Sequence, residues 1–328
     1  MEQELETFRK IIDKHEAFVL TTHINPDPDA IGSELALSYF LRRHGKKVHI
    51  LNQSPTPVNC EFLDSEREIA QYNETVHKQL LLDADVIFII DTNHLDRFPL
   101  LKPAVLASKA YKVCIDHHLD RAEFADLYII DEAAAATGEI LYTLFMSVDR
   151  ESITPNIAEQ LYAAIMTDTG SFRFPKTDAE LHHIIASLID RGADPISIYT
   201  QIYEQGTPNR ALLLGYALRT LTLAHENKVA HLHITRKMFQ ETVTDESDTE
   251  NIVNYALTLR EVRIALLFTE LDSSIKISFR SKGDIAINLL AQQFGGNGHK
   301  NAAGARIQNL SLKEVMQQVV HQAEQFLS

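Results

Sequence analysis

Residues 17–45 read AFVLTTHINPDPDAIGSELALSYFLRRHG. The apolar run AFVLTTH (17–23) predicts a buried strand, and the pattern AIGSELALSYFLRRHG (30–45) predicts an amphipathic helix that ends at Gly45. The loop between them contains two prolines, which stiffen it. A buried strand that leads directly into a helix is typical of a parallel sheet with helices packed on its faces.

The same alternation continues through the first half of the chain. Apolar segments 46–52, 85–93 and 112–118 predict further strands, and segments 136–148 and 155–168 predict helices. We therefore predict an α/β fold whose N-terminal domain is a doubly wound parallel sheet.

The second half has a different rhythm. Residues 194–224 are predicted to be mainly helical, and beyond them strands and helices mix in a pattern that favours a smaller mixed α/β domain. The expected division is a domain at 1–193, a linker at 194–224 and a second domain at 225–328. A length of 328 residues suits two domains.

The composition is acidic, with a formal net charge of −14 at pH 7. A protein that follows a long nucleic acid usually carries a basic stripe, and this sequence has only short basic pairs such as Arg42–Arg43. We therefore expect no long duplex partner. A small anion held in a local pocket remains compatible with this charge, especially beside metal ions.

The chain also lacks the usual signs of membrane or secretory targeting. No apolar run is long enough to span a bilayer, and the start MEQELETFRKIIDKHE is unlike a signal peptide. The two cysteines, Cys60 and Cys114, form no CxxC spacing and no disulfide framework. We expect a cytoplasmic protein with reduced thiols and no membrane partner.

Acidic and imidazole side chains gather where predicted elements end. They follow three predicted strands and one predicted helix: His23, Asp27, Asp29, Asp91, Asp116, His117, His118 and Asp168. In open α/β sheets, ligands bind beyond the carboxyl ends of the strands. Oxygen and imidazole donors without cysteine suit Mn²⁺, Mg²⁺ or Co²⁺ and argue against a closed structural zinc site.

Each of these residues also has an ordinary structural interpretation. A single Asp after a strand is usually a helix cap or a turn residue, and most of the 15 histidines must be unrelated to any site. The combined order favours a site: HxxPDxD, a strand-end Asp, a strand-end Asp-His-His and a further Asp. Two metal ions about 3.5–4 Å apart in such a cluster can clamp a phosphoryl group and activate a water molecule.

These segments resemble a known family. HINPDPDAIGS (23–33), IIDTN (89–93), CIDHH (114–118) and MTDTGSF (166–172) resemble the four motifs of the DHH phosphoesterase superfamily. GGNGHKNAAGA (295–305) resembles the glycine-rich signature of the DHH-associated C-terminal domain. The order and the two-domain layout are similar to the group of bifunctional oligoribonucleases and phosphoadenosine-phosphate phosphatases.

The resemblance implies two divalent metal ions, with Mn²⁺ favoured over Mg²⁺ and Co²⁺. It also implies the ligands: His23 and Asp27 for one ion, Asp91 for both, and Asp29, His117 and Asp168 for the second. Asp116 would orient an imidazole from behind the cluster. His118 would face the phosphate or the leaving oxygen as a hydrogen-bond donor or general acid.

In the second domain, the resemblance implies a substrate-binding set, and the active site would lie in the cleft between the domains. The set is Arg280, Ser281, Lys282, Gly296, Asn297, Gly298, His299, Ala302, Ala303 and Gly304. Small residues let backbone N–H groups approach an anion, although a tight loop packed under a sheet is the ordinary alternative. Asn297 stands where the signature usually has Gly, and Asn tolerates positive φ better than other residues with a side chain.

The implied activity is metal-dependent hydrolysis of phosphate esters in very short oligonucleotides, such as nanoRNA and linear dinucleotides, with release of 5′-mononucleotides. A second implied substrate is 3′-phosphoadenosine 5′-phosphate. Expected partners are short single-stranded RNA or DNA and nucleoside bisphosphates, and the resemblance suggests a homodimer. The alternatives are a RecJ-like single-strand exonuclease, a manganese pyrophosphatase and a non-catalytic nucleotide-binding module.

Overall fold

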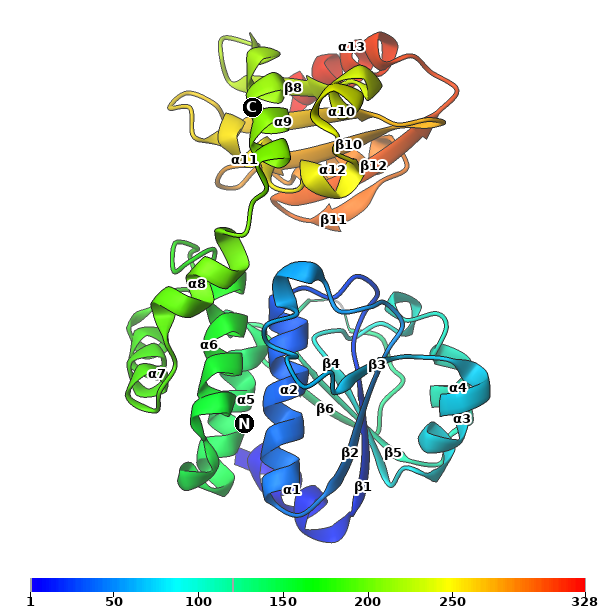
Figure 1. The fold of residues 1–328 in the computed structure, drawn as a ribbon, viewed down its shortest axis with the longest axis vertical. Coiled ribbons are helices and arrows are strands. Elements are labelled where there is room, and N and C mark those ends of the chain that lie inside the picture. The colour runs from blue at the N-terminus through cyan, green and yellow to red at the C-terminus, as the bar shows by residue number, and fades with distance from the viewer. Residues whose placement is uncertain (1, 120, 328) are drawn as a thin grey trace. The chain divides into compact units, whose positions relative to one another are not determined.

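The computed structural model describes residues 2–119 and 121–327, which divide into two compact units between Gln205 and Gly206 (Figure 1). The division falls inside the segment expected as a linker, 194–224. Helix α8 (Pro195–Tyr203) belongs to the first unit, and helix α9 (Pro208–Arg219) belongs to the second.

The first unit contains a six-stranded sheet in the order β3-β2-β1-β4-β5-β6. All neighbouring strands run parallel, which confirms the predicted doubly wound sheet. The strands are β1 (Ala17–Thr21), β2 (Lys47–Asn52), β3 (Ile69–Gln71), β4 (Val86–Ile90), β5 (Tyr111–Asp116) and β6 (Leu127–Ile130). The short edge strands β3 and β6 were not predicted, because neither carries the long apolar run of a central strand.

Helices cover both faces of this sheet (Figure 1). One face packs against α1 (Glu2–Lys14), α2 (Pro28–Arg43), α5 (Thr137–Val148) and α6 (Pro155–Asp168), and the other against α3 (Glu74–Asp83) and α4 (Lys102–Ala107). Helix α7 (Ala179–Asp190) packs on α5 and α6. Alternate residues of a strand serve opposite faces: Phe18 and Leu20 of β1 lie in one core cluster, and Val19 lies in the other.

Helix α2 begins and ends two residues earlier than predicted. Asp27 caps it by accepting the N–H of Ala30, and Pro28 occupies the first turn, where a missing N–H costs nothing. The helix lies directly against α6, because a Cβ on Gly32 would come within 2.5 Å of the carbonyl oxygen of Gln160. This close packing sets the start of α2 beside the end of α6.

The second unit contains a mixed six-stranded sheet in the order β11-β12-β10-β9-β8-β7, in which only β8 and β9 run parallel. This confirms the predicted mixed α/β character. The strands are β7 (Thr222–Ala224), β8 (Val229–Ile234), β9 (Ile264–Glu270), β10 (Ser274–Ser281), β11 (Asn297–His299) and β12 (Ala302–Gln308). The helices besides α9 are α10 (Arg236–Thr242), α11 (Ile252–Leu257), α12 (Ile287–Gln293) and α13 (Leu312–Ala323).

Candidate metal centre

Three adjacent strands of the first sheet end in the acidic and imidazole residues. His23 follows β1, Asp91 follows β4, and Asp116 ends β5. Strand β1 has β2 on one side and β4 on the other, so the strand order reverses at this point. In open α/β sheets, this reversal leaves a crevice at the carboxyl ends of the strands, which is where ligands bind.

Asp91 lies at the centre of the cluster. Its Oδ2 is 3.4 Å from Nε2 of His23, and its Oδ1 is 3.7 Å from Nε2 of His117 and 3.8 Å from Nδ1 of His118. Its backbone has a φ of +58°, a conformation unfavourable for a residue with a Cβ. Strain of this kind is typical of sites whose geometry is set by their surroundings.

The potential ligand atoms fall into compact groups, each within 4.8 Å. One group contains His23, Asp27 and Asp91, and a second contains Asp29, His117 and Asp168. A third group contains Asp91, Asp116, His117 and His118. The structure therefore brings together all eight residues that the sequence pointed to in this domain.

The second group lies at the start of α2 and at the ends of β5 and α6. Nε2 of His117 is 3.1 Å from Oδ2 of Asp168, the last residue of α6, and 3.9 Å from Oδ2 of Asp29. Nδ1 of His117 lies 3.4 Å from the carbonyl oxygen of Ala134. If that nitrogen carries the proton, Nε2 presents its lone pair to a cation.

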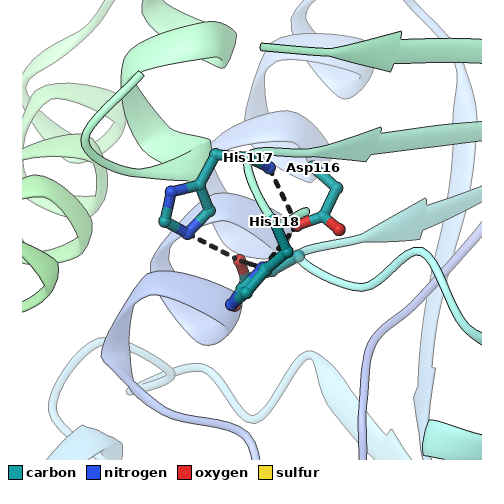
Figure 2. Close-up of side chains that lie close together, drawn as sticks. Asp116, His117 and His118 are labelled. Atoms are coloured by element: carbon teal, nitrogen blue, oxygen red, sulfur yellow. Dashed lines mark hydrogen bonds and ion pairs between the residues drawn. The ribbon is translucent and has the colours of Figure 1, made fainter. Parts of the chain in front are cut away.

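Asp116 holds the two histidines that follow it (Figure 2). Its Oδ1 accepts hydrogen bonds from the backbone N–H of His117 at 2.8 Å and from Nδ1 of His118 at 2.7 Å. Its Oδ2 is buried and has no hydrogen-bond partner. A fully buried carboxylate with an unsatisfied oxygen favours a nearby positive charge.

Burial and crowding disturb the protonation of the cluster. Burial, followed by the charge of Asp27, raises the pKa of Asp29 to about 7. Burial, followed by the charges of Asp29 and Asp27, raises the pKa of Asp168 to about 8. Burial, followed by the charges of Asp29 and Asp27, raises the pKa of Asp91 well above its ordinary value. Burial, followed by repulsion from His118, lowers the pKa of His117 to about 4.

His118, which is half-buried, is the exception among the imidazoles of the cluster. Burial alone would lower its pKa, but the hydrogen bond and charge of Asp116, with the charges of Asp29 and Asp27, raise it. Neutral His117 beside three crowded carboxylates is a donor set that suits a divalent cation. The raised pKa of His118 favours the positively charged ring, which suits contact with an anion.

Two residues that the sequence did not point to connect this cluster to α5. The backbone N–H groups of Thr137 and Gly138 donate to Oδ2 and Oδ1 of Asp29 at 2.8 and 3.0 Å. The hydroxyl of Thr137 donates to Oδ1 of Asp91 at 2.9 Å. The sequence did contain a signal for this contact. Ala136 occupies the N-cap of α5 and has no side chain that could cap it, so the first N–H groups of the helix need another acceptor.

The residues expected to bind substrate in the second unit also lie together. In the paired strands β10, β11 and β12, Arg280 and His299 both pair with Ala302, and Gly298 pairs with Ala303. The side chain of His299 lies outside the described part of the chain. Asn297 lies in strand β11 without positive φ, so the left-handed conformation considered for it is absent.

Some of these residues have local structural partners. Nζ of Lys282 donates to the carbonyl oxygen of Leu259, and Ser281 Oγ donates to that of Ile285. A Cβ on Gly298 would lie 2.5 Å from the carbonyl oxygen of Ala302, so tight strand packing by itself requires this glycine. Burial lowers the pKa of Arg280, whose Nη1 donates to the carbonyl oxygen of Phe279.

Both units of the chain resemble known protein domains. Residues 17–165 match the model of the DHH family, N-terminal domain, and residues 227–328 match that of the DHHA1 domain. The chain therefore contains a DHH domain followed by a DHHA1 domain. Like DHH phosphoesterases, this DHH protein is a hydrolase that acts on phosphate esters.

Relatives and a solved structure cover nearly the whole DHH chain. The bifunctional oligoribonuclease and PAP phosphatase NrnA of Bacillus subtilis is 29% identical over 91% of each chain. The protein of the same name from Thermus thermophilus is 26% identical over 94% of this chain and 90% of its own. The crystal structure of an exopolyphosphatase-related protein from Bacteroides fragilis is 29% identical, with a TM-score of 0.95, covering 99% of this chain and 97% of that one.

The described helices of this DHH protein include none that is both long and apolar enough to cross a membrane. Cys60 and Cys114 are both buried, and no disulfide joins them.

Proposed function

We propose that this DHH protein uses divalent metal ions to hydrolyse very short oligonucleotides, releasing 5′-mononucleotides, and that it also dephosphorylates 3′-phosphoadenosine 5′-phosphate. The observation that carries the proposal is the place of Asp91. Its carboxylate is shared between the group that contains His23 and Asp27 and the histidines that follow β5. One carboxylate between two donor groups is the arrangement that a two-metal site requires.

The donor set favours two ions, with Mn²⁺ as the first choice and Mg²⁺ or Co²⁺ as substitutes. His23 and Asp27 would hold one ion, Asp91 both, and Asp29, His117 and Asp168 the second. The bound ions would draw charge from the phosphate and lower the pKa of water. The orphaned Oδ2 of Asp116 and the raised pKa of Asp91 support a cationic occupant.

His118 would act on the substrate itself. Asp116 fixes its Nδ1, so proton exchange with the substrate falls to Nε2. Because the surrounding carboxylates raise its pKa, the ring is suited to donate a proton or a charged hydrogen bond to the leaving oxygen. Asp116 would keep the ring in that orientation.

The substrate class rests on the relatives and on charge. Two relatives that span this chain carry the name bifunctional oligoribonuclease and PAP phosphatase. The net charge of −14 supports short single-stranded RNA or DNA and nucleoside bisphosphates over a long duplex. The glycine-rich strands around Gly298, with Arg280, would bind the substrate beyond its scissile phosphate. We further propose that the protein acts in the cytoplasm, as a homodimer.

The deciding experiment compares substrates. Purified protein with Mn²⁺ is incubated with RNAs from a dinucleotide to a long single strand, with 3′-phosphoadenosine 5′-phosphate and with pyrophosphate. We expect mononucleotide release to be fastest from the shortest RNAs, phosphate release from the bisphosphate, and loss of both in Asp91→Ala. A matched control is Asp272→Ala in the second unit.

Other outcomes would point elsewhere. Preference for the long RNA would favour a RecJ-like exonuclease, and cleavage of pyrophosphate alone would favour a pyrophosphatase. Metal binding without turnover of any substrate would favour a non-catalytic nucleotide-binding module.

A further inference from the structure

The second unit contains a groove of about 630 Å³ between strand β8 and helix α13. His231 and His233 lie two apart on the strand and therefore face the same side. Leu312, Met316 and Val320 lie four apart and form one stripe of the helix. Small-molecule sites usually measure about 300–1,000 Å³, so the groove is of suitable size.

The groove is distinct from the glycine-rich strands of the same unit. Strand β8 is next to the edge strand β7, whereas β11, which carries Gly298, forms the opposite edge of the six-stranded sheet. A ligand in the groove would therefore not occupy the proposed substrate-binding strands.

An unusual turn holds a third histidine at the groove. Three successive residues with side chains have positive φ: His225 at 50°, Glu226 at 55° and Asn227 at 65°. This conformation is unfavourable for such residues. The ring of His225 lines the groove, and its Nε2 donates to the carbonyl oxygen of Val320 at 2.8 Å, which ties the turn to α13. A run of three left-handed residues also follows the metal cluster, at 170–172.

The two strand histidines are partly exposed, yet Nδ1 of each is buried and has no hydrogen-bond partner. The accessible edge of each ring is therefore the edge that carries Nε2. Burial, followed by the charge of His233, lowers the pKa of His231, and burial lowers that of His233, so both rings are neutral at pH 7. Because a buried N–H without an acceptor is costly, the single proton belongs on Nε2.

This arrangement does not suit a metal ion. A histidine that binds a metal through Nε2 almost always donates its Nδ1 proton to an acceptor, and these rings have none. Among the described residues, the groups with metal-ligand spacing all lie in the first unit. The groove instead offers two N–H donors set in an apolar wall.

We propose that this groove binds an aromatic organic phosphate of nucleotide size. The aromatic ring would pack against Met316 and Val320, and Nε2 of His231 and His233 would donate to its polar atoms. Lys313, which is exposed at the rim on α13, would pair with the phosphate. In a chain of net charge −14, the charge of Lys313 gives the phosphate a local partner at this rim.

The test is photolabelling of the full chain with an azido derivative of adenosine 5′-monophosphate. Divalent ions are chelated, so the metal centre contributes no phosphate binding and no turnover is needed. We expect label in the segments 222–233 and 312–321, with adenosine 5′-monophosphate competing about tenfold more strongly than adenosine, the effect of one charged contact. Lys313→Glu and Met316→Lys should each reduce the label about tenfold or more.

Lys237→Glu, on the surface of α10, is the matched control and should be labelled as strongly as the wild type. The melting temperature of every variant should equal that of the wild type. Label confined to the first unit or to 295–305, or no label, would overturn the proposal. Equal competition by adenosine would exclude phosphate recognition. If labelling falls as the protein concentration rises, a second copy of the chain covers the groove, and the proposal would be wrong.

Discussion

The hydroxyl of Thr137 donates a 2.9 Å hydrogen bond to Oδ1 of Asp91, while the backbone N–H of the same residue donates to Asp29 at 2.8 Å. A single residue at the start of α5 thus touches two of the carboxylates that crowd the strand ends. Since Thr137 is fully buried, these contacts are shielded from water. Hydrogen bonds to charged groups are stronger in such a buried environment than in water.

We expect Thr137→Val to weaken Mn²⁺ binding by about tenfold to a hundredfold, because Asp91 loses the group that orients it. Valine has nearly the same shape, so the fold should persist. Thr137→Ser keeps the hydroxyl and should restore most of the affinity. Titration calorimetry with Mn²⁺ measures both, and equal affinity in wild type and Thr137→Val would rule out this orienting role.

Asp91→Asn should have opposite effects on activity and on stability. The central carboxylate is lost, so turnover should fall by at least about a thousandfold, as expected when metal catalysis fails. The metal-free protein should become more stable by roughly 1–3 kcal/mol, because a buried charge beside Asp29 and Asp168 is removed. Thermal unfolding in a chelator tests the second effect, and a lower melting temperature would contradict it.

Stability of the metal-free protein should fall as pH rises from 6.5 to about 8. In the folded state, Asp29 and Asp168 have pKa values of about 7 and 8, whereas in the unfolded chain they titrate near 3.8. The folded state therefore holds more protons in this window, and each extra proton costs about 1.4 kcal/mol of stability per pH unit. His118, whose pKa is raised, acts in the same direction.

Saturating Mn²⁺ should remove this slope, because bound metal keeps the carboxylates deprotonated at every pH in the window. The rise in melting temperature caused by Mn²⁺ should therefore grow from pH 6.5 to 8. Unfolding scans with chelator and with Mn²⁺ at several pH values measure it. A metal-induced rise that shrinks with pH would show that the crowded carboxylates are not the ligands.

Gly138→Ala should destabilise the protein by about 1–3 kcal/mol, a typical cost of overpacking. The new Cβ would lie 2.8 Å from that of Ala164 on α6 and 3.5 Å from Oδ1 of Asp29. The matched control is Gly215→Ala, in the exposed middle of α9, where nothing lies within 4 Å. That change should stabilise by up to about 1 kcal/mol, since alanine favours helix. Denaturant unfolding of both variants is the measurement.

His118→Gln should separate catalysis from metal binding. The ring is proposed to contact substrate, so kcat should fall by about a hundredfold to ten-thousandfold, the usual range for a lost general acid. Mn²⁺ stoichiometry should stay that of the wild type, because His117 and Asp168 remain. Metal analysis beside kinetics tests this, and parallel loss of metal would make His118 a ligand instead.

The sequence by itself determined the four central strands of the first unit's sheet, β2, β1, β4 and β5, and the residues at their ends. Apolar runs such as VIFII form buried strands. In a parallel sheet, the polar residues that follow such strands lie at the same edge. For that reason His23, Asp91 and Asp116 were predictable as neighbours. Asp168 was recognised as the last residue of a predicted helix, but no local pattern specifies where that helix packs.

Only the tertiary structure decided how these side chains are held. The hydrogen bonds from Thr137 to Asp29 and Asp91 join residues 108 and 46 positions apart, and such pairings depend on how α5 packs beside α2. The groove between β8 and α13 likewise joins histidines to a helix about 80 residues later in the chain. Local patterns report which residues are buried, but distance between elements is set by packing, here by glycines such as Gly32 and Gly138 that let helices approach.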